Sequence, residues 1–381
     1  MRILQVNNIV SHHQLPFATE LMQLVGKENF LYAALGRPDS ERVRNGWITE
    51  YTEEWIIHPN ESTYEFKKYE DFWMNADIVI CAERLIERMQ DRLDRGKICF
   101  YMSERWWKPP IGIARLIHPN FFKMSLAFKK LSKSECFHYL PIGPFAAKDM
   151  RLLIGTKSSK WSWGYLTELP ESENLKNSKR FSDPVSILWV GRMLKLKRVD
   201  LLIKALAGLQ RGGKEFKLTL VGDGPERKNL EKLASKLLDN TFYEFKDFIP
   251  STEVLALMSN FDVYVLPSNA YEGWGAVVNE AMSVGCAVIA SDKTGAGATL
   301  IDSGTNGLLF KSGCYNSLYN ALNEIFTNQE LIDKFSKAGR HTIETEWNPK
   351  SAAEKIFELS NALLNNEKFI APNSGLLSKI N

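Results

Sequence analysis

Short runs of apolar residues alternate with longer amphipathic segments along the whole chain. In the first part, the apolar runs are residues 2–6, 31–35, 55–58, 78–82, 98–102 and 137–140. Between them lie segments with the spacing of a helix that is apolar on one face, such as residues 15–25 and 82–93. Strands that alternate with helices predict a parallel sheet covered by helices on both faces.

The second part of the chain repeats this pattern. Its apolar runs are residues 186–190, 217–221, 243–245, 263–266, 287–290 and 308–310. Its helical segments are residues 199–209, 225–238, 254–259 and 276–284. The chain therefore reads as an α/β protein with two doubly wound parallel sheets, each in its own domain.

Polar segments set the expected domain limits. We predict an N-terminal domain over 1–169, a linker over the polar stretch 170–184, and a C-terminal domain over 185–348. We expect a helix over 349–365 to pack back on the first domain, and residues 366–381 to form a flexible tail. Because ligands of doubly wound sheets bind beyond the carboxyl ends of the strands, we expect a site between the two domains.

Composition narrows the class of protein. A chain of 381 residues is too long for one hydrophobic core, and 48 basic against 45 acidic residues argue against nucleic acid as a partner. The five cysteines are dispersed, without the spacing of a metal site or a disulfide scaffold. The first residues lack the apolar stretch of a signal peptide, and no apolar run is long enough to span a membrane. We therefore expect a cytoplasmic protein.

The strongest local signal for chemistry lies in residues 263–285. A strand ends at a loop that contains Glu272, Gly273, Trp274 and Gly275, and a helix begins just after this loop. The two glycines leave backbone N–H groups uncovered where the helix dipole is positive. This geometry suits a phosphate group.

Glu280 lies in that helix, beside an expected core-facing stripe of Val277, Ala281 and Val284. A carboxylate in such a place is costly unless it accepts hydrogen bonds, for example from the hydroxyls of a sugar or ribose. Alternatively, Glu280 tilts to solvent and Glu272 is an ordinary loop acid. The two acids flank a glycine-rich turn, which favours a function for both.

The two glutamates form an E-x7-E motif, and the segment around it resembles the retaining GT-B glycosyltransferases of family 4, also called group 1. The upstream segment VGRMLKLK looks like that family's VGR-x4-K segment, and LTLVGDGPE looks like its next strand and loop. The resemblance covers residues 185–345 and extends loosely over the N-terminal half. It implies two Rossmann-like domains that face each other across a cleft.

The resemblance also implies roles for particular residues. It makes Glu272, Arg192 and Lys197 the catalytic set, in which the two cations hold the diphosphate of a UDP- or GDP-linked sugar. The implied donor-binding residues are Gly191, Gly222, Gly273, Trp274, Gly275 and Glu280. No metal and no further cofactor is implied. The plainer alternatives are that the two cations lie on the surface and that Trp274 only packs.

The N-terminal half departs from the family at the loop after the first strand, which lacks glycine. Ser11, His12 and His13 could replace that loop in the cleft, or the histidines could only cap a helix or pack. After a later strand, Glu104 could bind the acceptor or could pair with Arg105. These four residues, Ser11 to His13 and Glu104, are our candidates on the acceptor side.

Residues 105–133 interleave large aromatic residues with lysines and arginines. This composition suits peripheral attachment to an anionic membrane surface. The alternative is that the aromatic rings point into the core while the basic groups stay in water.

The resemblance implies a hexosyltransferase that moves a sugar, with retention, onto a hydroxyl of a glycan or lipid-linked glycan. Together with the basic aromatic segment, it suggests bacterial surface polysaccharide synthesis at the cytoplasmic face of the membrane. The alternatives are a nucleotide-sugar epimerase or hydrolase and a non-catalytic nucleotide-binding module. A dinucleotide-dependent oxidoreductase is disfavoured, because Arg227 occupies the third glycine position of the G-x-G-x-x-G motif.

Overall fold

The structure is a computed structural model that describes residues 1–380 apart from 41–42, 44–50, 107–118, 155–158 and 171–182. Contacts divide the chain into two units. Unit 1 comprises Met1–Glu168 together with Glu346–Asn381, and unit 2 comprises Leu169–Thr345. The linker predicted over 170–184 falls mostly outside the described residues.

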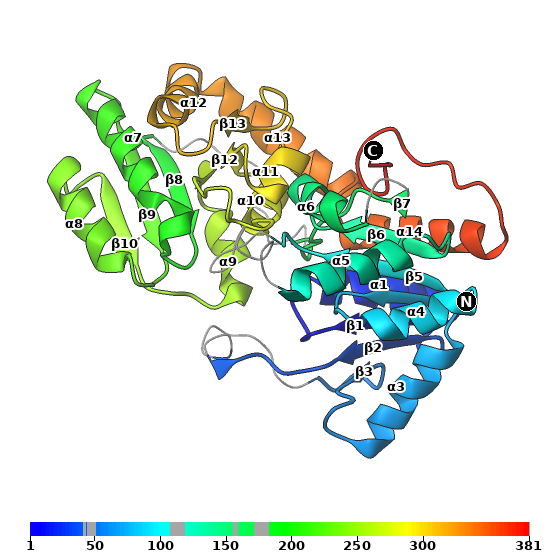
Figure 1. Cartoon of the computed structure of the whole chain (residues 1–381). Helices are drawn as coiled ribbons and strands as arrows, with labels where there is room; N and C mark the ends of the chain where they lie inside the picture. Colours follow the sequence, from blue (N-terminus) through cyan, green and yellow to red (C-terminus); the bar gives the residue numbers. More distant parts are fainter. Residues whose placement is uncertain (41–42, 44–50, 107–118, 155–158, 171–182, 381) are drawn as a thin grey trace. The chain divides into compact units, whose positions relative to one another are not determined.

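Unit 1 is built on a parallel sheet with the strand order β3-β2-β1-β4-β5-β6-β7 (Figure 1). Its strands are β1 (Ile3–Asn7), β2 (Phe30–Ala34), β3 (Ile56–Ile57), β4 (Ile78–Cys81), β5 (Ile98–Ser103), β6 (Phe137–Pro141) and β7 (Ser159–Lys160). Nearly every strand residue is buried, as expected when helices cover both faces of a parallel sheet. The order of the strands reverses between β1 and β4, so the loops after these strands flank the place where such sheets bind ligands.

The helices of unit 1 include one from the end of the chain. They are α1 (Leu15–Val25), α3 (Thr63–Asn75), α4 (Ile86–Asp94), α5 (Pro119–Leu131), α6 (Pro144–Ile154) and α14 (Pro349–Leu364). Helix α14 packs against α1. It begins where the Asn348 side chain accepts a hydrogen bond from the Ser351 N–H at 2.9 Å, with Pro349 in its first turn.

The last part of the segment after α14 is packed, which differs from the flexible tail predicted over 366–381, whereas residues 366–368 and Ile370 are exposed. The N–H of Leu377 donates to the carbonyl of Ser162 at 2.9 Å, and the N–H of Ile380 donates to that of Lys160 at 3.0 Å. Leu376 and Leu377 are fully buried. The edge strand β7 offers unpaired backbone groups, and this late segment binds them, a contact that local sequence composition does not reveal.

Unit 2 is a second parallel sheet, with the strand order β10-β9-β8-β11-β12-β13. Its strands are β8 (Val185–Val190), β9 (Phe216–Val221), β10 (Tyr243–Lys246), β11 (Val263–Leu266), β12 (Ala287–Ser291) and β13 (Leu308–Phe310). Its helices are α7 (Val199–Arg211), α8 (Arg227–Leu237), α9 (Ser251–Met258), α10 (Val277–Ser283), α11 (Gly295–Leu300), α12 (Tyr315–Thr327) and α13 (Glu330–Thr345). Here the strand order reverses between β8 and β11.

Both units therefore have the doubly wound α/β topology that the alternation of apolar runs predicts. Aromatic residues contribute heavily to their cores, and the largest fully buried side chains include Trp73, Trp163 and Trp189. All five cysteines lie in described segments, and none forms a disulfide. Over the described residues, no helix is both long and apolar enough to cross a membrane.

Candidate functional site

Two loops of unit 2 meet at the point where its strand order reverses. The loop after β8 carries Lys197, and the loop after β11 carries Glu272. Their side chains form an ion pair, with Lys197 Nζ 2.6 Å from Glu272 Oε2 and both side chains less than one fifth exposed. The structure thus brings together two of the three residues predicted to be catalytic. At this place the ammonium group can bind a negatively charged group of a ligand, and the carboxylate can accept hydrogen bonds from the hydroxyls of the same ligand.

A backbone hydrogen bond joins the two loops. The N–H of Asn269, in the second loop, donates to the carbonyl of Leu196 in the first loop at 2.9 Å. Lys197 ends a short 3-10 helix over Lys195–Lys197, after which the chain enters α7. The position of Lys197 therefore depends on a local helical turn and on a backbone bond to the facing loop.

Glycine lets the loop after β8 pack against the loop after β9. Gly222 has φ +128°, and a Cβ atom added there would lie 2.0 Å from the carbonyl oxygen of Gly191. The Gly191 N–H donates to the carbonyl of Val221 at 3.0 Å. These two predicted donor-binding glycines thus shape the backbone that presents Arg192, whose side chain is exposed. A side chain at position 222 would push that backbone away.

Backbone hydrogen bonds also join the loop after β11 to the start of α11. The N–H of Gly295 donates to the carbonyl of Gly273 at 3.1 Å, and the N–H of Ala296 donates to that of Trp274 at 2.8 Å. Gly275 has φ +87°, a conformation that favours glycine. These contacts fix the loop that carries Glu272 against the start of α11.

The Trp274 side chain is buried, with 1% exposed, and its indole N–H donates to Asn279 Oδ1 at 2.8 Å. The plainer alternative therefore holds for this ring, which packs in the core. Only the backbone of Trp274 remains a candidate for donor binding.

Glu280 lies on α10 and is half-buried. Burial raises its pKa from 4.5 to about 7. Ala281 and Val284 of the predicted core-facing stripe are buried, whereas Val277 is only half-buried. The stripe is thus confirmed for two of its three residues. Other residues of the helix are buried as well, namely Val278, Asn279, Met282 and Ser283, because α10 is enclosed on several sides.

The candidate residues of unit 1 form a connected cluster. The rings of His12 and His13 have centroids 3.8 Å apart, and the His13 ring stacks on Tyr165 at 5.2 Å. The Tyr165 hydroxyl donates to Glu104 Oε1 at 2.5 Å. The Ser11 hydroxyl oxygen accepts the N–H of His13 at 3.2 Å, which sets the turn before α1. Burial lowers the pKa of both histidines.

Tyr165 is the residue that sequence reasoning missed in this cluster. It follows β7 in a segment rich in aromatic residues, and no spacing or motif distinguishes it from its neighbours. The alternative partner for Glu104 was Arg105, but the Arg105 guanidinium pairs with Asp149, at 3.2 Å from Nε to Oδ2. Arg105 thus has a partner in α6, and Glu104 has one in Tyr165.

The basic aromatic segment divides between core and surface. Trp106 and Phe128 are buried, whereas Phe122 and Leu126 on α5 are 62% and 69% exposed. The exposed lysines of this part are Lys123, Lys129, Lys130 and Lys133. Trp107, Lys108 and Arg115 lie outside the described residues. The alternative of inward-facing rings thus holds for two of the aromatic residues and fails for Phe122.

Comparison with known proteins adds three findings. Residues 171–342 match the family described as glycosyl transferases group 1. An uncharacterized glycosyltransferase of Methanocaldococcus jannaschii is 30% identical over 190 residues, which cover 49% of this chain and 48% of that protein. The GDP-mannose-dependent alpha-(1-6)-phosphatidylinositol monomannoside mannosyltransferase of Mycolicibacterium smegmatis is 27% identical over 179 residues, covering 45% and 47%. The chain spans about half the length of these relatives.

The fold is similar over a longer stretch. The crystal structure of the Anabaena protein HepE in complex with UDP matches with a TM-score of 0.66 and 14% identity. The match covers 95% of this chain and 100% of the Anabaena chain. Both units described above therefore have counterparts in one known architecture.

Proposed function

We propose that this chain transfers a sugar from a nucleotide diphosphate sugar to a hydroxyl group. Its residues 171–342 match the group 1 glycosyl transferases, and its two Rossmann-like units have the GT-B fold. The observation that carries this proposal is the Lys197–Glu272 ion pair at the strand-order reversal of unit 2. A cation there offsets the charge of a departing diphosphate, and a carboxylate beside it accepts hydrogen bonds from sugar hydroxyls.

In the proposed reaction, the bond from the anomeric carbon to the diphosphate breaks, and its electron pair leaves with the phosphate oxygen. The acceptor oxygen bonds to that carbon with retention of configuration, and its proton passes to the oxygen of the departing diphosphate. Lys197 and Arg192 stabilise the leaving group, and Glu272 orients both Lys197 and the sugar. This chemistry depends on positioning and charge, so we expect transfer to persist in EDTA.

The proposed donor is UDP- or GDP-linked. The Anabaena protein of similar fold was crystallised with UDP, and the mycobacterial relative is named for its use of GDP-mannose. Glu280 is proposed to accept hydrogen bonds from the ribose hydroxyls, and its raised pKa means that it can also be protonated near neutral pH. The backbone around Gly273 and Gly275 is proposed to contact the donor sugar and phosphate.

A thermal-unfolding series tests donor binding. We expect UDP, GDP or one of their sugar conjugates to raise the melting temperature, because a ligand at 100 times its Kd stabilises the folded state by about 2.7 kcal/mol. AMP and inorganic phosphate serve as controls. If none of the uridine or guanosine diphosphates raises the melting temperature above these controls, the donor site is refuted. Release of free sugar or an epimer without transfer would instead favour a hydrolase or an epimerase.

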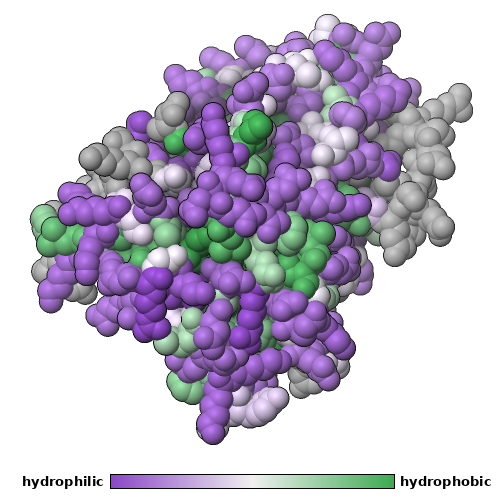
Figure 2. Space-filling model, turned by 90° about the vertical axis from the view of Figure 1, so that its right-hand side faces the viewer, coloured by the Kyte–Doolittle hydropathy of each residue, from purple (hydrophilic) through white to green (hydrophobic). Residues whose placement is uncertain are grey.

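The proposed acceptor is a glycan or lipid-linked glycan at the cytoplasmic face of a bacterial membrane, as in surface polysaccharide synthesis. Two observations support this proposal. The mycobacterial relative is named for a lipid-linked acceptor. On α5, Phe122 and Leu126 are exposed together with lysines. Hydrophobic residues also reach the surface elsewhere, as Figure 2 shows for one face of the molecule. The support for membrane binding by α5 is therefore that its exposed apolar residues lie beside lysines.

Vesicle flotation tests this surface. We expect the protein to bind phosphatidylglycerol-containing vesicles more tightly than phosphatidylcholine vesicles, because each lysine near an anionic surface adds about 1 kcal/mol. Replacing both Phe122 and Leu126 with serine is expected to weaken binding about a hundredfold or more, since insertion of each side chain contributes about 1.5–3 kcal/mol. Tyr64→Ser, at a 76% exposed residue of α3, is the control. Equal recovery with both lipids would refute the membrane role.

A further inference from the structure

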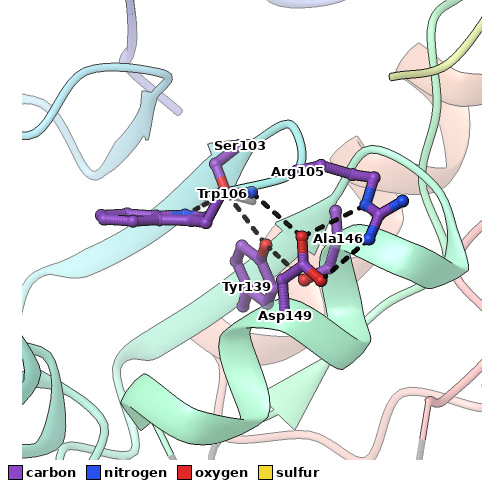
Figure 3. Close-up of polar contacts among 6 residues, drawn as sticks. All are labelled: Ser103, Arg105, Trp106, Tyr139, Ala146 and Asp149. Atoms are coloured by element: carbon purple, nitrogen blue, oxygen red, sulfur yellow. Dashed lines mark hydrogen bonds and ion pairs between the residues drawn. The ribbon is translucent and has the colours of Figure 1, made fainter. Parts of the chain in front are cut away.

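Strand β5 ends at Ser103, immediately before Glu104, and its end is held by the elements beside it (Figure 3). The Ser103 hydroxyl is hydrogen-bonded to the Tyr139 hydroxyl of β6 at 2.9 Å. The same tyrosine hydroxyl donates to the carbonyl of Ala146 in α6 at 3.4 Å. The residue before Glu104 is thus fixed to both the neighbouring strand and the following helix.

The two residues after Glu104 are fixed by Asp149 of α6. The Asp149 carboxylate is 5% exposed and accepts the backbone N–H of Trp106 at 3.1 Å. It also pairs with the Arg105 guanidinium, with Nε to Oδ2 at 3.2 Å and Nη2 to Oδ1 at 3.3 Å. Figure 3 shows both contacts converging on this one carboxylate. A buried carboxylate with two partners of this kind holds a loop more rigidly than a surface ion pair does.

Glu104 lies between these anchored residues, and its side chain binds Tyr165 at 2.5 Å. A carboxylate accepts several hydrogen bonds at once, so it can bind Tyr165 and a sugar hydroxyl together. The stacking of Tyr165 on His13 links this carboxylate to the loop after β1, beside the strand-order reversal of unit 1. Groups supported in this way by a second layer of contacts are typical of binding sites.

We propose that Asp149 is a positioning residue that sets the Glu104 carboxylate, together with Tyr165, to bind a hydroxyl of the acceptor sugar. The inference rests on the proposed function and adds the residues that orient the acceptor. Asp149 is 5% exposed, and we assign it no contact with a substrate. It acts through the side chain of Arg105 and the backbone of Trp106, which are the two residues after Glu104.

The test measures two rates of the full-length protein. One is hydrolysis of the nucleotide sugar without acceptor, and the other is transfer to p-nitrophenyl glycosides of glucose, galactose, mannose and N-acetylglucosamine. Asp149→Asn is expected to raise the KM for an accepted glycoside about tenfold, because a small displacement of a positioned group is costly. Hydrolysis of the donor is expected to stay within about twofold of the unmodified rate, since donor binding is assigned to unit 2. Asp91→Asn, in an exposed Asp–Arg pair of the same unit, is the matched control.

A double variant separates positioning from general destabilisation. If Asp149 acts through Glu104, then Asp149→Asn adds little to the effect of Glu104→Gln, whereas independent effects would multiply. The inference would be overturned if the effects of the two substitutions multiplied, or if Asp149→Asn left the KM unchanged. It would also be overturned if the unmodified protein transferred the sugar to water but to none of the glycosides. Absence of any donor turnover in the unmodified protein would instead refute the proposed function.

Discussion

Replacing Lys197 with alanine is expected to lower the rate of sugar transfer by about a hundredfold to a thousandfold, the usual loss when one charge-stabilising group is removed from a transition state. The ammonium group lies 2.6 Å from Glu272 in an ion pair that is mostly buried, at the carboxyl ends of β8 and β11. The other lysine of this loop, Lys195, is exposed and does not lie in this mostly buried environment. The measurement is the initial rate of nucleoside diphosphate release with acceptor present.

Lys195→Ala is the matched control, since it removes the same side chain from the same helical turn. We expect it to keep the rate within about twofold, as for a surface residue without a specific contact. Because Lys197→Ala also deprives Glu272 of this cation, the free energy of unfolding is measured alongside, with an expected loss of about 1–3 kcal/mol. Equal rates for Lys197→Ala and the unmodified protein would refute the assignment of the ion pair to catalysis.

Replacing Gly222 with alanine is expected to lower the free energy of unfolding of unit 2 by about 3 kcal/mol or more, among the largest effects of a single substitution. The added Cβ atom would lie 2.0 Å from the Gly191 carbonyl oxygen, and the backbone has φ +128°. The loops after β8 and β9 would have to separate, which would also move Arg192. Urea unfolding and the affinity for the nucleotide are the two measurements.

Gly213→Ala provides the comparison within the same unit. Gly213 has φ +76°, but nothing lies within 4 Å of an added Cβ atom, so only the backbone preference is lost. We expect that variant to lose about 1 kcal/mol. If the two variants were equally stable, the close approach of the two loops would not be the reason for glycine at position 222.

Much of the fold follows from local patterns. The strands that the apolar runs predict are all found, because most of them are buried on both faces of a parallel sheet, where apolar residues are required. The edge strand β10 is the exception, since its residues alternate between half-buried and exposed. The E-x7-E spacing likewise placed Glu272 and Glu280 on one loop and the helix after it. These features depend on residues close together in the sequence.

The features that sequence reasoning missed depend on contacts between distant residues. Tyr165 meets Glu104 across 61 positions, and Asp149 meets Arg105 across 44. Ile380 donates its N–H to Lys160 of β7 across 220 positions of the sequence, and no local pattern around it predicts this contact. The sequence alone leaves two roles open for Trp274, because a ring in a glycine-rich loop can face either a ligand or the core. Only the position of Asn279 decides between them.

The chain leaves unit 1 after Glu168 and returns to it at Glu346, so unit 1 is assembled from two segments that lie on either side of unit 2 in the sequence. During synthesis, the whole of unit 2 emerges from the ribosome before α14 does. Until then, the face of α1 that receives α14 has no cover, and β7 lacks the backbone partners supplied by the last residues. Unit 2 can therefore complete its own sheet during translation before unit 1 does, because unit 1 also needs residues that are made after unit 2.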